Sequence, residues 1–116
     1  MTGEYNNCKL VPAASCNYRK GRIHSIDRVI IHATQGDSLD GCVGWFAHPR
    51  PSAPSSAHYT IGADGEVVQS VLEADTAYAA PNYNGRGIHI EHVGFVDLTV
   101  FSGKQYDVSA KLTRHL

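Results

Sequence analysis

The feature that most constrains the fold is an apolar run over residues 28–34, Arg-Val-Ile-Ile-His-Ala-Thr, which ends in polar residues. As a β-strand, the run has a side-chain period of two, so Ile30, His32 and Thr34 share one face. His32 then lies where a buried sheet meets solvent, a position that holds a ligand rigidly and leaves it accessible. A buried core histidine is the alternative, and the rest of the sequence decides between the two.

A second run with strand character covers residues 87–93, Gly-Ile-His-Ile-Glu-His-Val. The same period places His89 and Glu91 on one face of this strand and His92 on the other. A carboxylate inside an apolar strand is costly to bury unless another group pairs with it. Glu91 is therefore the second candidate functional residue.

The segment between the two runs predicts a helix and a hairpin. Ser38 can cap a short helix that Pro49 ends. Its apolar stripe comprises Leu39, Cys42, Val43 and Phe46. Residues 57–62 and 66–71 flank an Asp-Gly turn, which is a strong hairpin signal. Residues 73–86 follow as a long loop without structure of its own, of the kind that often binds a ligand.

A second helix is predicted from the capping box Ser102-Gly-Lys-Gln105, with Phe101 and Tyr106 placed for a hydrophobic staple. Its apolar stripe comprises Val108, Leu112 and Leu116. The irregular residues 1–27 are expected to form an arm around the core. Their basic cluster of Arg19, Lys20 and Arg22 is interpreted as solvated. Together these elements predict an α/β fold, with a mixed sheet of four or five strands and flanking helices.

Composition excludes several classes of function. With 116 residues the chain forms one domain, and its net charge of −1 gives no support to nucleic acid binding. No apolar window is long enough to cross a membrane, and residues 1–7 lack the features of a signal peptide. Cys8 and Cys16 could form one disulfide, with Cys42 as a small apolar helix residue, but three cysteines leave this open.

In the order of its motifs the chain resembles the zinc-dependent N-acetylmuramoyl-L-alanine amidases, a family that includes phage endolysins and peptidoglycan recognition proteins. The matching segments are the strand ending at His32, the hairpin of residues 56–69, the loop of residues 75–84, the strand carrying Glu91 and the helix of residues 104–116. The resemblance implies a mixed central sheet with flanking helices, and a Zn²⁺ ion that activates water to cleave the amide between N-acetylmuramic acid and L-alanine of peptidoglycan.

Carried over residue by residue, the resemblance makes His32 a zinc ligand and Glu91 the catalytic base. The family's remaining ligands follow the long helix, so we expect residues 28–116 to be the N-terminal portion of one amidase domain, preceded by the arm. On this expectation residues 1–116 alone are inactive or bind metal only weakly. The alternatives are a catalytically inactive peptidoglycan-binding module and half of a split domain. The endolysin branch implies a phage lysin made in the host cytoplasm and acting on the cell wall.

Other residues are weaker candidates. His89 stands where the family usually has glycine, and because it shares a strand face with Glu91 it could approach the metal as a further ligand. Trp45, Asn82 and Asn84 are candidates for binding a muropeptide in a groove walled by residues 35–57 and 73–86. Neither nucleic acid nor membrane insertion is expected, and the sequence does not predict the oligomeric state.

Overall fold

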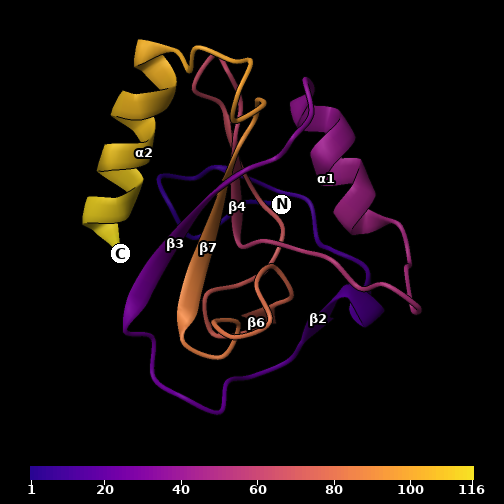
Figure 1. Ribbon diagram of the computed structural model, residues 1–116. Helices are drawn as coiled ribbons and strands as arrows, with labels where there is room; N and C mark the ends of the chain where they lie inside the picture. The colour runs from indigo at the N-terminus through magenta and orange to yellow at the C-terminus, as the bar shows by residue number, and fades with distance from the viewer.

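The structure is a computed structural model that describes residues 1–116 (Figure 1). A five-stranded sheet is formed by β1 (Lys9–Leu10), β3 (Arg28–Ala33), β4 (Tyr59–Ile61), β5 (Val67–Gln69) and β7 (Gly87–His92). A two-stranded sheet is formed by β2 (Tyr18–Arg19) and β6 (Thr76–Ala77). The helices are the 3₁₀ turn η1 (Ser15–Asn17), α1 (Leu39–Ala47) and α2 (Gly103–His115). No helix has the length and apolar character needed to span a bilayer.

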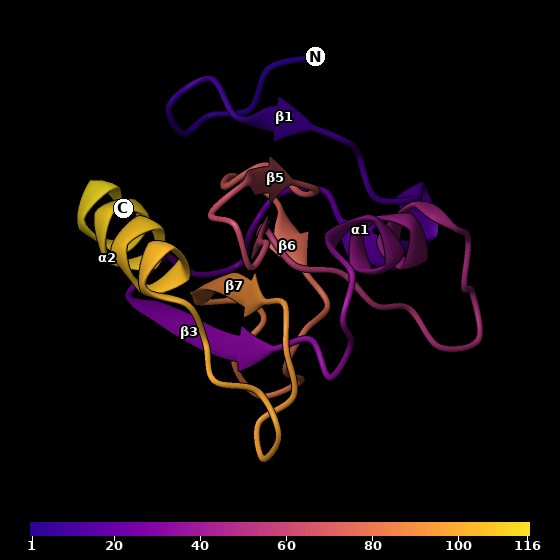
Figure 2. The ribbon, with the colours of Figure 1, turned by 90° about the horizontal axis from the view of Figure 1, so that it is seen from above.

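The large sheet is mixed, with the strand order β1-β5-β4-β7-β3 (Figure 2). Strand β7 lies between β3 and β4 and pairs in parallel with both. Strands β4 and β5 form the predicted antiparallel hairpin, whose turn uses Gly65 at a φ of +89°, a conformation that favours glycine. The predicted α/β fold with a mixed sheet is confirmed.

The two helices cover opposite faces of this sheet (Figure 1). On the α2 face, Leu112 is buried in a cluster with Tyr59, Ile61, Ile88 and Ile90. On the α1 face, Phe46 is buried in a second cluster with Ala13, Ala57, Val71 and Ala77. Tyr59 and Ile61 are alternate residues of β4 and share the α2 face, whereas Ala57 and Val71 of the α1 cluster lie just outside the two hairpin strands. The polar residues of the site lie on the α1 face.

Both predicted N-caps form, but the capping box at α2 is only half made. The Ser38 hydroxyl accepts from the Gly41 amide, and the Ser102 hydroxyl accepts from the Gln105 amide. The Gln105 side chain does not reach back to Ser102, so that part of the prediction is wrong. It is buried and donates to two carbonyls, of Ile61 on β4 and of Val93 after β7. The Gln105 side chain thus makes tertiary hydrogen bonds to the sheet in place of the local bond that a complete capping box requires.

We expect Gln105→Ala to destabilise the fold by about 2 kcal/mol, because two buried carbonyl oxygens lose their donor. The free energy of unfolding in urea measures the effect. Lys104→Ala, at an exposed neighbouring position of the same helix, is the matched control and should change stability by less than about 0.5 kcal/mol. Equal effects of the two substitutions would show that the Gln105 amide does not tie α2 to the sheet.

The arm and the long loop are more ordered than the sequence predicts. Strand β1 of the arm pairs with β5, and β2 pairs with β6 inside the loop of residues 73–86. The interpretation of Arg22 as a solvated cation is wrong. Its guanidinium donates to the carbonyls of Glu73, Gly85 and Gly87 over 2.8–3.4 Å, which ties the arm to the loop and to the start of β7.

Arg22→Met should therefore loosen the loop of residues 73–86 and lower stability by about 1–2 kcal/mol, since three carbonyls lose a charged donor. Amide hydrogen exchange across the loop measures the local opening. Arg19→Met in the same basic cluster, where the side chain is exposed, is the control and should leave exchange unchanged. Unchanged exchange in Arg22→Met would mean that β2 and β6 hold the loop without the guanidinium.

Candidate active site

The site lies at the carboxyl ends of the parallel strands β3 and β7, the edge at which α/β sheets bind ligands. His32 and Glu91 are register partners on these strands, and both side chains lie on the α1 face. The distance from His32 Nδ1 to Glu91 Oε1 is 3.9 Å. The two candidate functional groups are therefore brought together as the strand pattern predicts.

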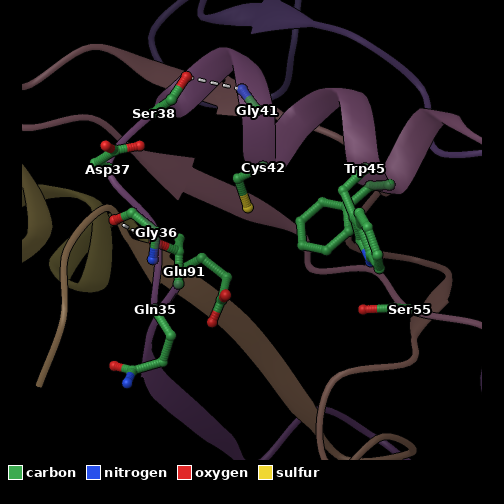
Figure 3. A pocket seen from close by; sticks show the side chains of 11 residues that line it. Gln35, Gly36, Asp37, Ser38, Gly41, Cys42, Trp45, Ser55 and Glu91 are labelled. Atoms are coloured by element: carbon green, nitrogen blue, oxygen red, sulfur yellow. Dashed lines mark hydrogen bonds between the residues drawn. The ribbon is translucent and has the colours of Figure 1, made fainter.

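A cleft of about 450 Å³ opens beside Glu91, between α1 and the end of β3 (Figure 3). It is lined by Thr34, Gln35, Gly36, Asp37, Ser38, Gly41, Cys42, Trp45, Phe46, Ser55 and Glu91. Most of these groups are polar, so the cleft suits a ligand rich in hydroxyl and amide groups. His32 does not line this cleft and lies beside Glu91 at its border.

The environment of Glu91 keeps its carboxyl group ready to exchange a proton near neutral pH. Burial raises the pKa of Glu91 from its ordinary value of 4.5 to about 7. The pKa of His32 is lowered, chiefly by burial and then by the neighbouring His92. Near pH 7 Glu91 is therefore about half ionised, whereas the lowered pKa of His32 favours its neutral imidazole, so their contact is not a pair of opposite charges. A carboxyl with this pKa suits general acid–base chemistry.

Two further histidines lie on the same face as the pair. His89 is fully buried, and its Nδ1 lies 2.9 Å from His32 Nε2. The ring of His58 stacks on that of His89, with an interplanar angle of 8°. His92 lies on the opposite face and contacts the Ser109 hydroxyl. The predicted common face of His89 and Glu91 matches this arrangement, whereas the approach of His89 to a metal ion as a further ligand stays a prediction.

The zinc ion implied by the resemblance needs three protein ligands. No three histidine, cysteine, aspartate or glutamate side chains of residues 1–116 are grouped so as to hold a metal ion. The His32 ring has polar contacts with Glu91 and with His89 among these side chains, and the contact with His89 occupies its Nε2. The residues present fit one ligand position of such a site and do not fit the complete set.

The weaker substrate candidates separate into two groups. Trp45 lines the cleft with its indole 53% exposed, and the Arg50 guanidinium covers one ring face at 3.1 Å from the centroid. Asn82 and Asn84 do not line the cleft. The Asn84 side chain accepts from the amides of Ala79 and Ala80, which holds its own loop. The cleft beside Glu91 is thus walled by the 35–57 segment, while the predicted second wall of a substrate groove from residues 73–86 does not line it and stays a prediction.

Sequence reasoning missed the polar turn of residues 34–38 and the thiol of Cys42 as cleft residues. The available signal was position, because the turn directly follows a parallel strand at its carboxyl end. Cys42 also packs against the α1 cluster, and burial raises the pKa of its thiol to about 11, with Glu91 contributing further. It is therefore a poor nucleophile. All three cysteines are free thiols.

The mixed sheet with a helix on each face has counterparts among solved structures. The fold matches a crystal structure of AmpD with a TM-score of 0.81 and 23% identity, over 99% of this chain and 76% of that chain. It also matches Drosophila peptidoglycan recognition protein SA with a TM-score of 0.71 and 17% identity, over 93% of this chain and 71% of that chain. The chain therefore shares the fold of these proteins.

Sequence comparison defines the family. Residues 22–116 match the family described as N-acetylmuramoyl-L-alanine amidase (Amidase_2), and the chain belongs to it. It is 38% identical over 107 residues to N-acetylmuramoyl-L-alanine amidase A of Achromobacter lyticus. The match covers 90% of this chain and 58% of that relative. The family resemblance found in the sequence is confirmed.

Proposed function

We propose that this chain carries the base and part of the substrate cleft of a peptidoglycan hydrolase, which cleaves the amide between N-acetylmuramic acid and L-alanine. The observation that carries the proposal is the contact of His32 with a carboxyl of raised pKa at the mouth of a polar cleft. Membership of the amidase family supports the choice of reaction. The bacterial cell wall is then the site of action, and a phage lysin remains our expected origin.

In this proposal Glu91 does the proton transfer. Its carboxylate takes a proton from the attacking water and its carboxylic acid returns one to the leaving amine of L-alanine. A pKa of about 7 lets one group do both at neutral pH. Hydroxyl and amide groups of the 34–38 turn and Ser55 line the cleft in which the substrate would lie. Zinc is the metal we expect beside His32, although residues 1–116 supply only one of its ligands.

The test is incubation of the purified chain with purified cell wall and added zinc, followed by detection of peptides with a new L-alanine amino terminus. Release that a chelator abolishes supports the hydrolase. Wall binding that survives the chelator, with no release, would contradict it and favour a catalytically inactive binding module. Release that starts only when a separately expressed C-terminal segment of a relative is added would favour half of a split domain.

A muropeptide should also change the fluorescence of Trp45, the single tryptophan of the chain, because its partly exposed indole lines the cleft. Trp45→Ala should weaken binding of a muramyl peptide about tenfold, as expected for loss of an aromatic contact. Calorimetric titration measures the affinity of both chains. Tyr83→Ala, an exposed aromatic outside the cleft, is the control, and equal loss in both variants would contradict a role for the cleft.

A further inference from the structure

One proton lies between the facing nitrogens of His32 and His89, and the ring that carries it decides whether the His32 nitrogen on the side of Glu91 has a free lone pair. His32 Nε2 and His89 Nδ1 are 2.9 Å apart. Of two neutral rings facing each other in this way, one nitrogen must donate and the other must accept. If His32 donates, its Nδ1 is left with a free lone pair on the side of Glu91, 3.9 Å from the carboxyl oxygen.

His58 holds the His89 ring in place. The backbone amide of His89 donates to His58 Nδ1 over 3.0 Å, so that nitrogen carries no proton. His58 Nε2 must then carry the proton of the neutral ring, and it donates to the Asp75 carbonyl over 2.9 Å. Arg22 Nη2 also lies 3.1 Å from this nitrogen, but both atoms are then donors, and Arg22 Nη2 donates to the Gly87 carbonyl. With its protonation fixed, His58 stacks on His89 at a centroid distance of 5.9 Å. The position of His89 is therefore fixed by its place in β7 and by stacking against the His58 ring.

The far side of the His89 ring shows where its own proton lies. His89 Nε2 is buried and has no partner with full hydrogen-bond geometry. The Tyr83 backbone carbonyl interacts with the His89 ring. A side-chain carbon at Gly87 would contact both this oxygen, at 3.1 Å, and Nε2, at 3.3 Å, so the carbonyl lies on the Nε2 side of the ring. A protonated Nε2 faces this carbonyl favourably, whereas a bare Nε2 would put two lone pairs together in a buried space.

We propose that His89 is a positioning residue, which accepts a hydrogen bond from His32 Nε2 and so directs the free Nδ1 of His32 toward Glu91. The chain of contacts runs from the Asp75 carbonyl through His58 and His89 to His32. A histidine whose second nitrogen is fixed in this way presents one defined lone pair to a reactant or a metal ion. The use of that lone pair rests on the proposed function, but the position of the proton does not.

Nuclear magnetic resonance of the metal-free chain tests the proposal without substrate or activity. At about pH 8, where the histidines are neutral, we expect a slowly exchanging imidazole proton bonded to His32 Nε2. His89→Asn keeps an oxygen near the position of Nδ1 and should keep this signal. His89→Gln keeps a polar group only near the position of Nε2, so the signal should be lost to exchange with water.

Dispersed amide spectra of both variants establish that they fold, and the wild-type spectrum is decisive by itself. A proton bonded to His89 Nδ1 in place of His32 Nε2 would overturn the proposal. Equal behaviour of the two variants, whether both keep or both lose the signal, would also overturn it, because the acceptor would then not select the state of His32. A failed hydrolysis assay would leave these spectra unaffected.

Discussion

Glu91→Gln should lower the rate of L-alanine peptide release by about 10²–10⁴-fold, the range that loss of a general acid–base group produces. The amide of glutamine has nearly the same shape as the carboxyl, so the cleft keeps its form while the proton acceptor is lost. Rates are measured as new L-alanine amino termini from purified cell wall, with zinc and a separately expressed C-terminal segment of a relative added to both chains, because residues 1–116 supply only one zinc ligand.

The matched control for this prediction is Glu66→Gln, because Glu66 is exposed on the hairpin and does not line the Glu91 cleft. Its rate should equal that of the wild type. Binding of a muramyl peptide, measured by Trp45 fluorescence, should be similar in all three chains. The lower rate of Glu91→Gln would then reflect a slower chemical step and not weaker binding. A Glu91→Gln chain that retains full activity would remove the carboxyl from the mechanism.

The long elements were predictable because each has a clear sequence pattern. Strands β3 and β7 are short runs rich in isoleucine, and α1 and α2 show apolar stripes with an N-cap. Strands β1, β2 and β6 have two residues each, which is too short for any period to show. They form because segments distant in the sequence supply their hydrogen-bond partners, and a local sequence pattern does not reveal such partners.

The sequence predicts which side chains of the site share a face of one strand, but it does not predict which side chains of different strands are in contact. Alternation along one strand places His89 and Glu91 on a common face, but the register of β7 on β3 decides that Glu91 lies opposite His32. The burial of Arg22 has the same origin, because its three acceptors lie 51 or more residues away in the sequence. The local sequence shows which chemical group a side chain carries, but the tertiary fold determines which groups it contacts.

Glu91→Gln should also stabilise the protein, and the gain should depend on pH. The folded-state pKa of about 7 lies above the ordinary value of 4.5, so the folded protein holds this proton more tightly than the unfolded chain does. Stability is therefore lost as pH rises from about 4.5 through 7, because the carboxylate that forms is buried. The lost stability reaches at most about 3 kcal/mol above pH 7.

Unfolding in urea at about pH 4 and pH 8 measures the effect as the difference between Glu91→Gln and wild type. That difference should be near zero at the lower pH and should approach about 3 kcal/mol at the higher one. Burial also lowers the pKa of His58 to about 3 and of His89 to about 4, so stability falls as pH drops below 6.5. This loss occurs in both chains and cancels in the difference.

A difference that does not change with pH would mean that Glu91 titrates near its ordinary value, and a base suited to neutral pH would then be absent. A difference that grows as predicted would show that the fold is less stable because it keeps this carboxyl out of water. Residues selected only for stability do not carry such a cost, whereas catalytic groups often do. The pH dependence therefore tests the catalytic assignment of Glu91 in a chain that need not turn over substrate.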